Sequence, residues 1–216
     1  MDAVRITTED NVSLEGEIRL PEGPPAGSAV LCHALPIAGG SKDHPILWAI
    51  RNELTARRFA VLSFNFRGVM HSGGTYAGGR AEVRDVAAAV AFVRERADGP
   101  TLGCGWSFGA NVALREAVED PRVAGLALVG IPLGERASDV PELPSPSELR
   151  AFRRPVLLLS GEGDTFSPRP ELELLARRLP ASELAIIPGT DHFLWRREKQ
   201  AAGRIGAFAG ALLAGT

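Results

Sequence analysis

The stretch over 102–111, Leu-Gly-Cys-Gly-Trp-Ser-Phe-Gly-Ala-Asn, constrains the fold of this chain more than any other part. It places the pattern Gly-x-Ser-x-Gly at 105–109, after a short apolar run over 100–104 that predicts a buried strand, and before a predicted helix over 108–118. A sharp strand-to-helix turn of this kind holds the serine, Ser107, with its Oγ exposed at the mouth of the helix. The flanking glycines remove side chains that would clash there.

Strands and helices alternate along the rest of the chain. The first two expected strands alternate apolar and polar residues, which predicts an antiparallel hairpin, whereas most of the later ones are apolar runs typical of strands covered on both faces. We therefore predict an α/β fold, with a mostly parallel central sheet of about eight strands and helices on both faces. Further strands are expected over 4–7, 12–20, 28–32, 59–66, 123–129, 156–160 and 184–187, and further helices over 46–57, 81–96, 171–179 and 193–213.

Length and composition narrow the class of protein. A chain of 216 residues, 45% hydrophobic and 23% charged, fits one ordinary globular domain over residues 1–216. The net charge of -2 offers no basic footprint for nucleic acid, and no apolar run is long enough to span a membrane. The first residues do not resemble a secretory signal, so we expect a cytoplasmic protein. Cys32 and Cys104 both fall in predicted buried strands, and we interpret them as free core thiols.

Two further residues follow predicted strands and complete the chemistry that a serine nucleophile needs. A serine requires a base to accept its proton, and the base requires an acid to orient it. His192 follows the last predicted strand and is the candidate base, and Asp164 follows the strand over 156–160 and is the candidate acid. Loops at the carboxyl ends of parallel strands meet at one edge of the sheet. Glu162 and Asp191 remain rival acids, and Asp164 could also be a plain turn residue.

The chain resembles the α/β-hydrolase superfamily, and within it a small, lidless bacterial group of esterases and dipeptidyl-peptidase-like hydrolases. The resemblance rests on Leu-Ser-Phe-Asn-Phe-Arg-Gly-Val at 62–69, Gly-Trp-Ser-Phe-Gly at 105–109 and Gly-Thr-Asp-His-Phe at 189–193. The order Ser107, Asp164, His192 is the order of that superfamily. The resemblance implies one α/β-hydrolase domain and says little about the substrate, because this fold hosts many reactions.

The same resemblance implies an oxyanion hole of two backbone N–H groups. One would come from Phe108, directly after the nucleophile, and the other, by position, from Leu35 in the loop that follows the strand over 28–32. His33 would then shape that loop, and Arg67 would anchor another loop through an ion pair. His44 and His71 are expected to be solvated, because both fall in loops. Together with Asp43 they match no familiar zinc pattern, so we do not expect them to bind zinc. No cofactor or metal is expected.

A reduced cap is predicted over 131–154. Five prolines interrupt the interval 130–155, and only 147–153 could form about two helical turns, so a cap of several helices cannot be built. We therefore expect an open, shallow cleft bordered by this segment and the loop over 67–79. A homodimer is the alternative, in which the surface of a second copy would cover the cleft.

The leading hypothesis is a serine hydrolase that acts through an acyl-enzyme on a small carboxylic ester or related acyl compound. The same residues would serve an acyltransferase or a peptidase, and a catalytically silent binding module on the same fold is the alternative from another class. The sequence does not separate these readings, nor does it identify the acyl group.

Overall fold

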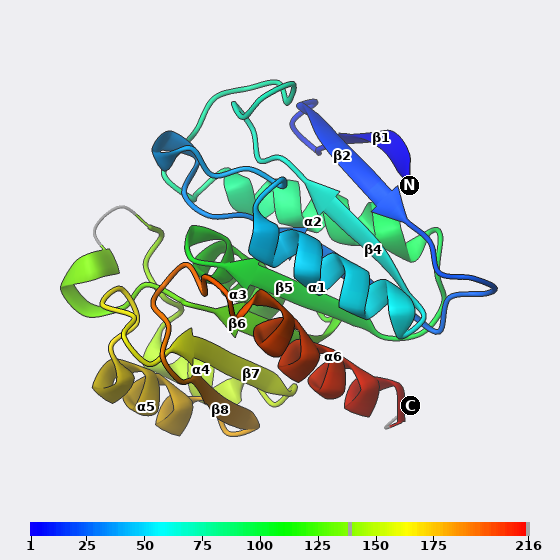
Figure 1. Ribbon diagram of the computed structural model, residues 1–216. Helices are drawn as coiled ribbons and strands as arrows, with labels where there is room; N and C mark the ends of the chain where they lie inside the picture. The colour runs from blue at the N-terminus through cyan, green and yellow to red at the C-terminus, as the bar shows by residue number, and fades with distance from the viewer. Residues whose placement is uncertain (138–139, 215–216) are drawn as a thin grey trace.

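The computed structural model describes residues 1–137 and 140–214, and within them eight strands form one sheet (Figure 1). The strand order is β1-β2-β4-β3-β5-β6-β7-β8. The strands are β1 (Asp2–Thr7), β2 (Ser13–Arg19), β3 (Gly27–Cys32), β4 (Phe59–Phe64), β5 (Thr101–Trp106), β6 (Val123–Val129), β7 (Val156–Gly161) and β8 (Ser182–Ile187). The helices are α1 (Pro45–Ala56), α2 (Glu82–Arg94), α3 (Phe108–Glu119), α4 (Pro146–Ala151), α5 (Arg169–Arg178) and α6 (Glu198–Ala214), with short 3-10 turns η1 (Pro36–Ala38) and η2 (Gly134–Ala137).

The sheet is mostly parallel, which confirms the predicted fold class. β1 and β2 form the antiparallel hairpin expected from their alternating pattern, and β2 also pairs antiparallel with β4. All pairs from β4 through β8 are parallel. In β3 through β7 every residue but one is buried, as continuous apolar runs in a sheet covered on both faces require.

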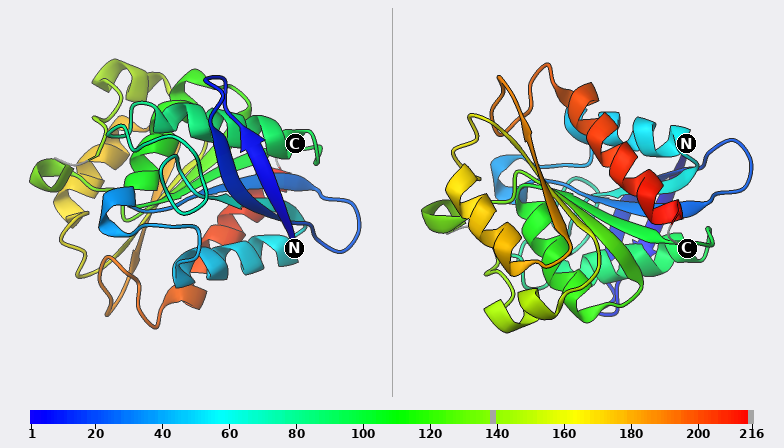
Figure 2. Two further views of the ribbon diagram at one scale, coloured as in Figure 1. Left: turned by 90° about the horizontal axis from the view of Figure 1, so that it is seen from above. Right: turned by 90° about the horizontal axis from the view of Figure 1, so that it is seen from below.

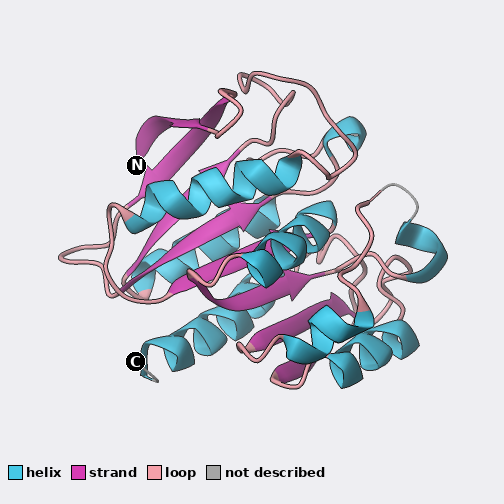
Figure 3. Ribbon diagram, turned by 180° about the vertical axis from the view of Figure 1, so that it is seen from behind, coloured by secondary structure: helices cyan, strands magenta, loops and turns pink. Residues whose placement is uncertain are grey.

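Helices cover both faces of the sheet (Figure 2, Figure 3). Helices α1 and α6 pack together on one face, where their apolar residues share a core with side chains from β3 through β8. The core of the other face takes its helical residues from α2, α3, α4 and α5. The two cores lie on opposite sides of one sheet, so the carboxyl ends of its central strands are held rigidly.

The chain reverses its direction of winding at the centre of the sheet, between β3 and β5. From β3 the chain adds β4 on one side, and it then returns to place β5 on the other. The loops that leave the carboxyl ends of these two neighbouring strands separate at this point, which is where open α/β sheets form their ligand sites. The loops after β3 and after β8 both reach this edge, on the left of Figure 1.

Most element boundaries agree with expectation to within two residues, and the last helix is the main exception. We expected it over 193–213, but α6 begins at Glu198. Leu194 and Arg196 adopt left-handed backbone angles, with φ of 56° and 63°, and helical hydrogen bonding cannot pass through such residues. The residues from 193 to 197 form turns instead, and they carry aromatic side chains to the edge of the sheet.

The segment over 131–154 contains little regular structure. Helix α4 has six residues and begins with a capping box, in which Ser145 and Glu148 each accept the other's backbone N–H. Residues 138–139 of the predicted cap lie outside the described residues. In the part that is described, η2 and α4 are the helical elements, as the distribution of prolines predicts.

Candidate active site

Ser107 occupies a strained turn between β5 and α3. Its φ of 56° and ψ of -125° are sparsely populated for a residue with a side chain. A Cβ on Gly105 would collide with the carbonyl oxygen of Gly109, and a Cβ on Gly109 would collide with that of Cys32. Both glycines are therefore required for the close approach of α3 to the strands, as the sequence pattern indicated.

The structure brings Ser107, His192 and Asp164 into one hydrogen-bonded row. The Ser107 Oγ lies 2.9 Å from His192 Nε2, and His192 Nδ1 lies 2.9 Å and 3.1 Å from the two carboxylate oxygens of Asp164. Each of the three residues is no more than 8% exposed. This row can move a proton from the serine hydroxyl to the imidazole while the carboxylate fixes the tautomer of the ring.

Asp164 is surrounded by donors as well as by the histidine. The Ser160 hydroxyl donates to Oδ2 at 2.9 Å, and the N–H groups of Phe166 and Ser167 donate to Oδ1 at 2.8 Å and 3.1 Å. Burial by itself would raise the pKa of Asp164, but the hydrogen bonds from His192, Ser160 and Phe166 hold that pKa below its usual value. The carboxylate is therefore kept ionised and fixed in place.

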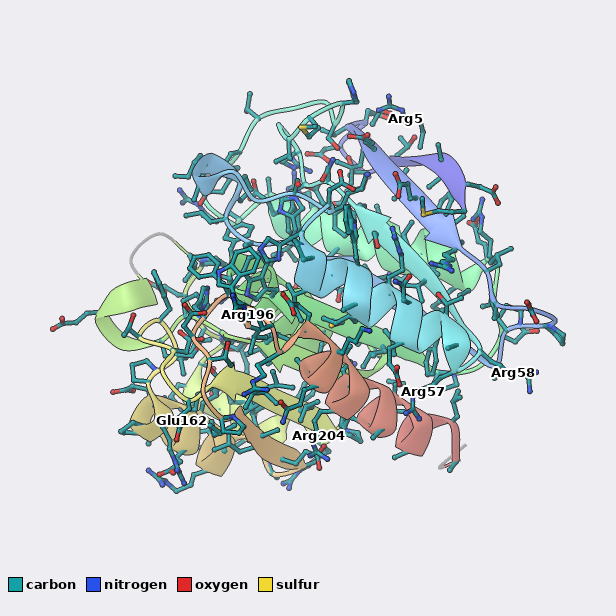
Figure 4. All side chains as sticks on the ribbon, viewed as in Figure 1. Arg5, Arg57, Arg58, Glu162, Arg196 and Arg204 are labelled. Atoms are coloured by element: carbon teal, nitrogen blue, oxygen red, sulfur yellow. The ribbon has the colours of Figure 1, made fainter. Side chains whose placement is uncertain are left out.

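The two rival acids accept hydrogen bonds from backbone N–H groups other than that of His192. Glu162, labelled in Figure 4, accepts the N–H of Gly189 at 3.0 Å. Asp191 accepts the N–H of Phe193 at 3.0 Å. Neither carboxylate shares a hydrogen bond with His192 among the described residues. The geometry brings Asp164 to the histidine, and it leaves Glu162 and Asp191 as residues that shape turns.

Two further residues contact the row, and sequence reasoning missed both. The Trp106 indole N–H donates to the backbone oxygen of His192 at 3.1 Å, and so ties the serine turn to the histidine loop. A Cβ on Gly130 would lie 3.1 Å from both Asp164 Oδ2 and His192 Nδ1, in a position where φ is 53°. The position of each residue was the available sequence signal for a place in the site. Trp106 is the residue directly before the serine in Gly-x-Ser-x-Gly, and Gly130 directly follows β6.

The loop after β3 is fixed by His33, which is fully buried. Its Nε2 accepts the N–H of Phe66 at 3.0 Å, so in the neutral ring Nδ1 donates to the oxygen of Ala34 at 2.7 Å. Burial lowers the pKa of His33 to about 4, which keeps it neutral. Because a trans peptide points its C=O and N–H in opposite directions, this hydrogen bond also fixes the direction of the Leu35 N–H.

A cavity of about 540 Å³ contains Ser107 and His192 in its wall. Leu35 lines it, and so do residues of the loop that leads to α1, the segment that includes Pro132 and Val140, and several aromatic rings. Ser107 and His192 therefore share one cavity with Leu35. A larger hollow of about 1010 Å³ over α2 and α3 includes none of the three residues of the row.

The expectation that the loop over 67–79 borders this cavity is wrong. Arg67 holds that loop against α2 and the first hairpin through ion pairs with Asp85 at 2.6 Å and with Asp10 at 2.8 Å. The loop over 34–45 takes its place as a wall of the cavity. The anchoring role expected for Arg67 agrees with these contacts, and they explain why the loop lies elsewhere.

His44 differs from the solvated residue that we expected. It is half-buried at the N-terminus of α1, and its ring stacks on Trp106 with centroids 4.1 Å apart. His71 is exposed, in agreement with the expectation. Cys32 and Cys104 are buried and free. Within residues 1–137 and 140–214, no cluster of three histidine, cysteine or acidic side chains could hold a metal ion, and no helix is long and apolar enough to cross a membrane.

Comparison with known proteins finds one matching family and several similar proteins. The model of the alpha/beta hydrolase domain family matches residues 27–209. A crystal structure from Xanthomonas campestris, described as an α/β serine hydrolase without a lid, is 25% identical, with a TM-score of 0.79 over 96% of this chain and 94% of that one. An α/β serine hydrolase homologue from Coxiella burnetii is 24% identical, with a TM-score of 0.82 over 96% of both chains. An uncharacterized protein of Rickettsia prowazekii (strain Madrid E) is 25% identical over 83% of this chain and 77% of its own length.

Proposed function

The chain belongs to the alpha/beta hydrolase domain family, and from this premise we propose that it is a serine hydrolase that cleaves small carboxylic esters through an acyl-enzyme. One observation carries the proposal, namely the row in which His192 lies 2.9 Å from the Ser107 hydroxyl and 2.9 Å from the Asp164 carboxylate. The lidless serine hydrolase from Xanthomonas campestris, 25% identical, supports the same class of reaction.

In the proposed reaction, Ser107 Oγ attacks the ester carbonyl carbon while His192 Nε2 accepts the hydroxyl proton. The tetrahedral intermediate then collapses, the bond to the alcohol oxygen breaks, and His192 passes its proton to that oxygen. A water molecule, deprotonated by His192, attacks the acyl-enzyme in turn and releases the carboxylic acid and free Ser107. Asp164 stabilises the imidazolium in both halves of the reaction.

The negative oxygen of the intermediate is proposed to bind the N–H groups of Phe108 and Leu35. Phe108 is the first residue of α3, so its N–H has no acceptor within the helix, and it lies at the positive end of the helix dipole. Leu35 lines the cavity that contains Ser107, and no hydrogen bond from its N–H occurs among the described residues. Each such donor contributes a factor of about 10² to 10³ in rate.

A small substrate is favoured by the size of the cavity and by the reduced cap over 131–154, in what we treat as one domain over residues 1–216. A volume of about 540 Å³ suits a molecule of moderate size and leaves most of a long acyl chain outside. Each CH₂ group left in water forgoes about 0.8 kcal/mol of transfer free energy. The expected result with p-nitrophenyl esters of two to sixteen carbons is a kcat/KM that stops rising well before the longest chain.

Labelling with a fluorophosphonate probe tests the proposal directly. The wild-type protein should gain one phosphonyl group, and the peptide that carries it should contain Ser107. Ser147→Ala is a matched control, because Ser147 is an exposed serine on α4, and it should label like the wild type. An unlabelled wild-type protein that is folded would refute the assignment and favour a silent binding module.

An acyltransferase or a peptidase would use the same row of residues. If the acyl group on Ser107 is transferred to an added amine or alcohol faster than to water, the products will contain the new amide or ester. Product analysis with and without such an acceptor therefore separates hydrolysis from acyl transfer.

A further inference from the structure

The wall of the cavity beside His192 consists of aromatic rings that lie partly in water. Phe193 is 41% exposed and Trp195 is 51% exposed, although both are large apolar side chains. Phe166, on the same cavity, is 36% exposed. Exposed apolar rings that gather around one cavity mark a binding surface more strongly than single exposed residues do.

Four aromatic rings on this cavity, two of them the exposed rings of Phe193 and Trp195, form a closed cluster, which we name the aromatic cluster: Trp106, His44, Trp195 and Phe193. The ring of His44 lies 4.1 Å from that of Trp106 and 5.6 Å from that of Trp195. Trp195 and Phe193 stack at 6.1 Å with an angle of 20° between their planes, and Phe193 meets Trp106 at 6.2 Å. Each ring contacts two others, so the exposed faces of Phe193 and Trp195 are held in place before a ligand arrives.

The aromatic cluster adjoins the ring that would deliver the proton to the leaving group. The His192 ring lies 5.6 Å from that of Phe193 and 5.9 Å from that of Trp106. A leaving alcohol oxygen must come within hydrogen-bond reach of His192 Nε2 to accept that proton. Phe166, on the same cavity, lies 4.6 Å from the His192 ring. The group attached to the oxygen therefore begins among these aromatic rings, and the aromatic cluster continues the cavity wall from Phe193 to Trp195.

The charges around the cavity exclude an anionic group at this position. The ionisable side chains that line it are Asp43, His44 and His192, and no lysine or arginine lines it among the described residues. Arg196, labelled in Figure 4, directly follows Trp195 but is exposed and does not line the cavity. A carboxylate or phosphate on the alcohol would find no cation here.

We propose that the alcohol part of the substrate is an aromatic group without a negative charge, which stacks on the exposed rings of Phe193 and Trp195. The inference rests on the proposed esterase function and names the class of alcohol for the same site. A flat aromatic ring matches a preformed aromatic face over its whole area, whereas a puckered saturated ring of similar size contacts it at a few atoms. Stacking of this kind favours the flat ring by about fivefold.

Two acetate esters isolate this effect from the chemistry. Benzyl acetate and cyclohexylmethyl acetate both release a primary alcohol of similar acidity and similar size, so a difference in kcat/KM reports recognition of the ring. We expect the wild type to prefer benzyl acetate by about fivefold or more. We expect Trp195→Leu to reduce this ratio to within twofold of one.

Trp48→Leu is the matched control. Trp48 is 45% exposed, close to Trp195, but it lies on α1 and does not line the cavity. The Trp48→Leu variant should keep the wild-type ratio, and a thermal melt should show that both variants fold.

The outcomes separate the two levels of inference. If the wild type hydrolyses both esters with equal kcat/KM, or if Trp195→Leu keeps the preference, the aromatic alcohol is refuted while the esterase stands. If neither ester is hydrolysed and Ser107 does not label with a fluorophosphonate, the esterase itself is refuted, and this inference falls with it.

Discussion

A buried carboxyl group lies near each end of helix α3, and the surroundings of the two groups have opposite effects on their pKa values. At the N-terminal end, the Asp164 carboxylate accepts hydrogen bonds from His192, Ser160 and two backbone N–H groups. At the C-terminal end, Glu116 is 2% exposed, and no N–H group among the described residues donates to either of its carboxylate oxygens. Hydrogen bonds hold the pKa of Asp164 below its usual value, whereas burial and the neighbouring Asp120 raise the pKa of Glu116 to about 9.

Two arginines lie near Glu116, but both are engaged elsewhere. Arg122 pairs with Asp120 at 2.6 Å. Arg154 donates to the backbone oxygens of Ala117, Asp120 and Val123, and so satisfies carbonyl groups at the end of α3. A nearby cation does not keep a buried carboxylate charged when its donors are already used. The partners of a buried carboxyl, and not its burial alone, therefore decide whether it carries charge.

The substitution with the largest expected effect on activity is Ser107→Ala, at the N-terminal end of α3. We expect turnover of a small activated ester to fall by about 10⁶, because loss of the nucleophile in such a row costs about that much. Steady-state kinetics measure the loss, and circular dichroism checks that the variant folds. Activity within tenfold of the wild type would show that another group performs the attack.

The next largest effect concerns the carboxylate that holds the histidine. Asp164→Asn removes the charge and favours the wrong imidazole tautomer, which reduces kcat by about 10⁴ in a comparable arrangement. Glu162→Gln, two residues away, should change kcat by less than about threefold, because among the described residues its carboxylate binds the Gly189 N–H and not His192. A greater loss from Glu162→Gln than from Asp164→Asn would mean that Glu162 is the orienting acid.

At the other end of the helix, we expect Glu116→Gln to stabilise the protein. The folded pKa of about 9 lies above the usual 4.5, so the stability associated with the protonated carboxyl is complete below pH 4.5 and is lost as pH rises toward 9. Glutamine does not ionise in either state. The variant should therefore gain about 2–3 kcal/mol at pH 7, and the gain should grow with pH over this range.

Urea unfolding at several pH values measures this gain. Glu119→Gln is the matched control, because Glu119 lies on the same turn of α3 but is exposed, and its effect should be small at every pH. A Glu116→Gln variant that is less stable than the wild type at pH 8 would show that the carboxylate has a partner in solution.

The smallest expected effect on kcat comes from a substitution at Trp106, near the N-terminal end of α3. Trp106→Phe keeps an aromatic ring against His44 but removes the indole N–H that donates to the His192 oxygen at 3.1 Å. Because the backbone of His192 then loses the hydrogen bond that holds it in position, kcat should fall by about tenfold. A tenfold loss corresponds to the free energy of about one buried hydrogen bond. A change confined to KM would assign Trp106 to substrate contact and not to the positioning of His192.

The fold class could be predicted from the sequence because each central strand is a continuous apolar run and each main helix repeats apolar residues at helical spacing. The strand β6 was expected over 123–129 and occupies those residues. The start of α6 could not be predicted, since Leu194 and Arg196 show no sequence signal for the left-handed angles that end helical geometry there. Leu194 is buried in the core that α1 and α6 share with the sheet, and a local sequence pattern does not specify such a contact.

The sequence alone predicted Ser107 and His192, because each follows an apolar strand, and it favoured Asp164 over Glu162 and Asp191 as the acid. The folded structure places Asp164 against His192, and no local pattern specifies this, because side chains on neighbouring loop residues can point in different directions. The same holds for the cavity wall. Local sequence patterns indicate which residues follow a strand. They do not indicate that the loop over 67–79 packs against Asp85, or that His44 packs against Trp106, because each of these contacts joins separate segments of the chain.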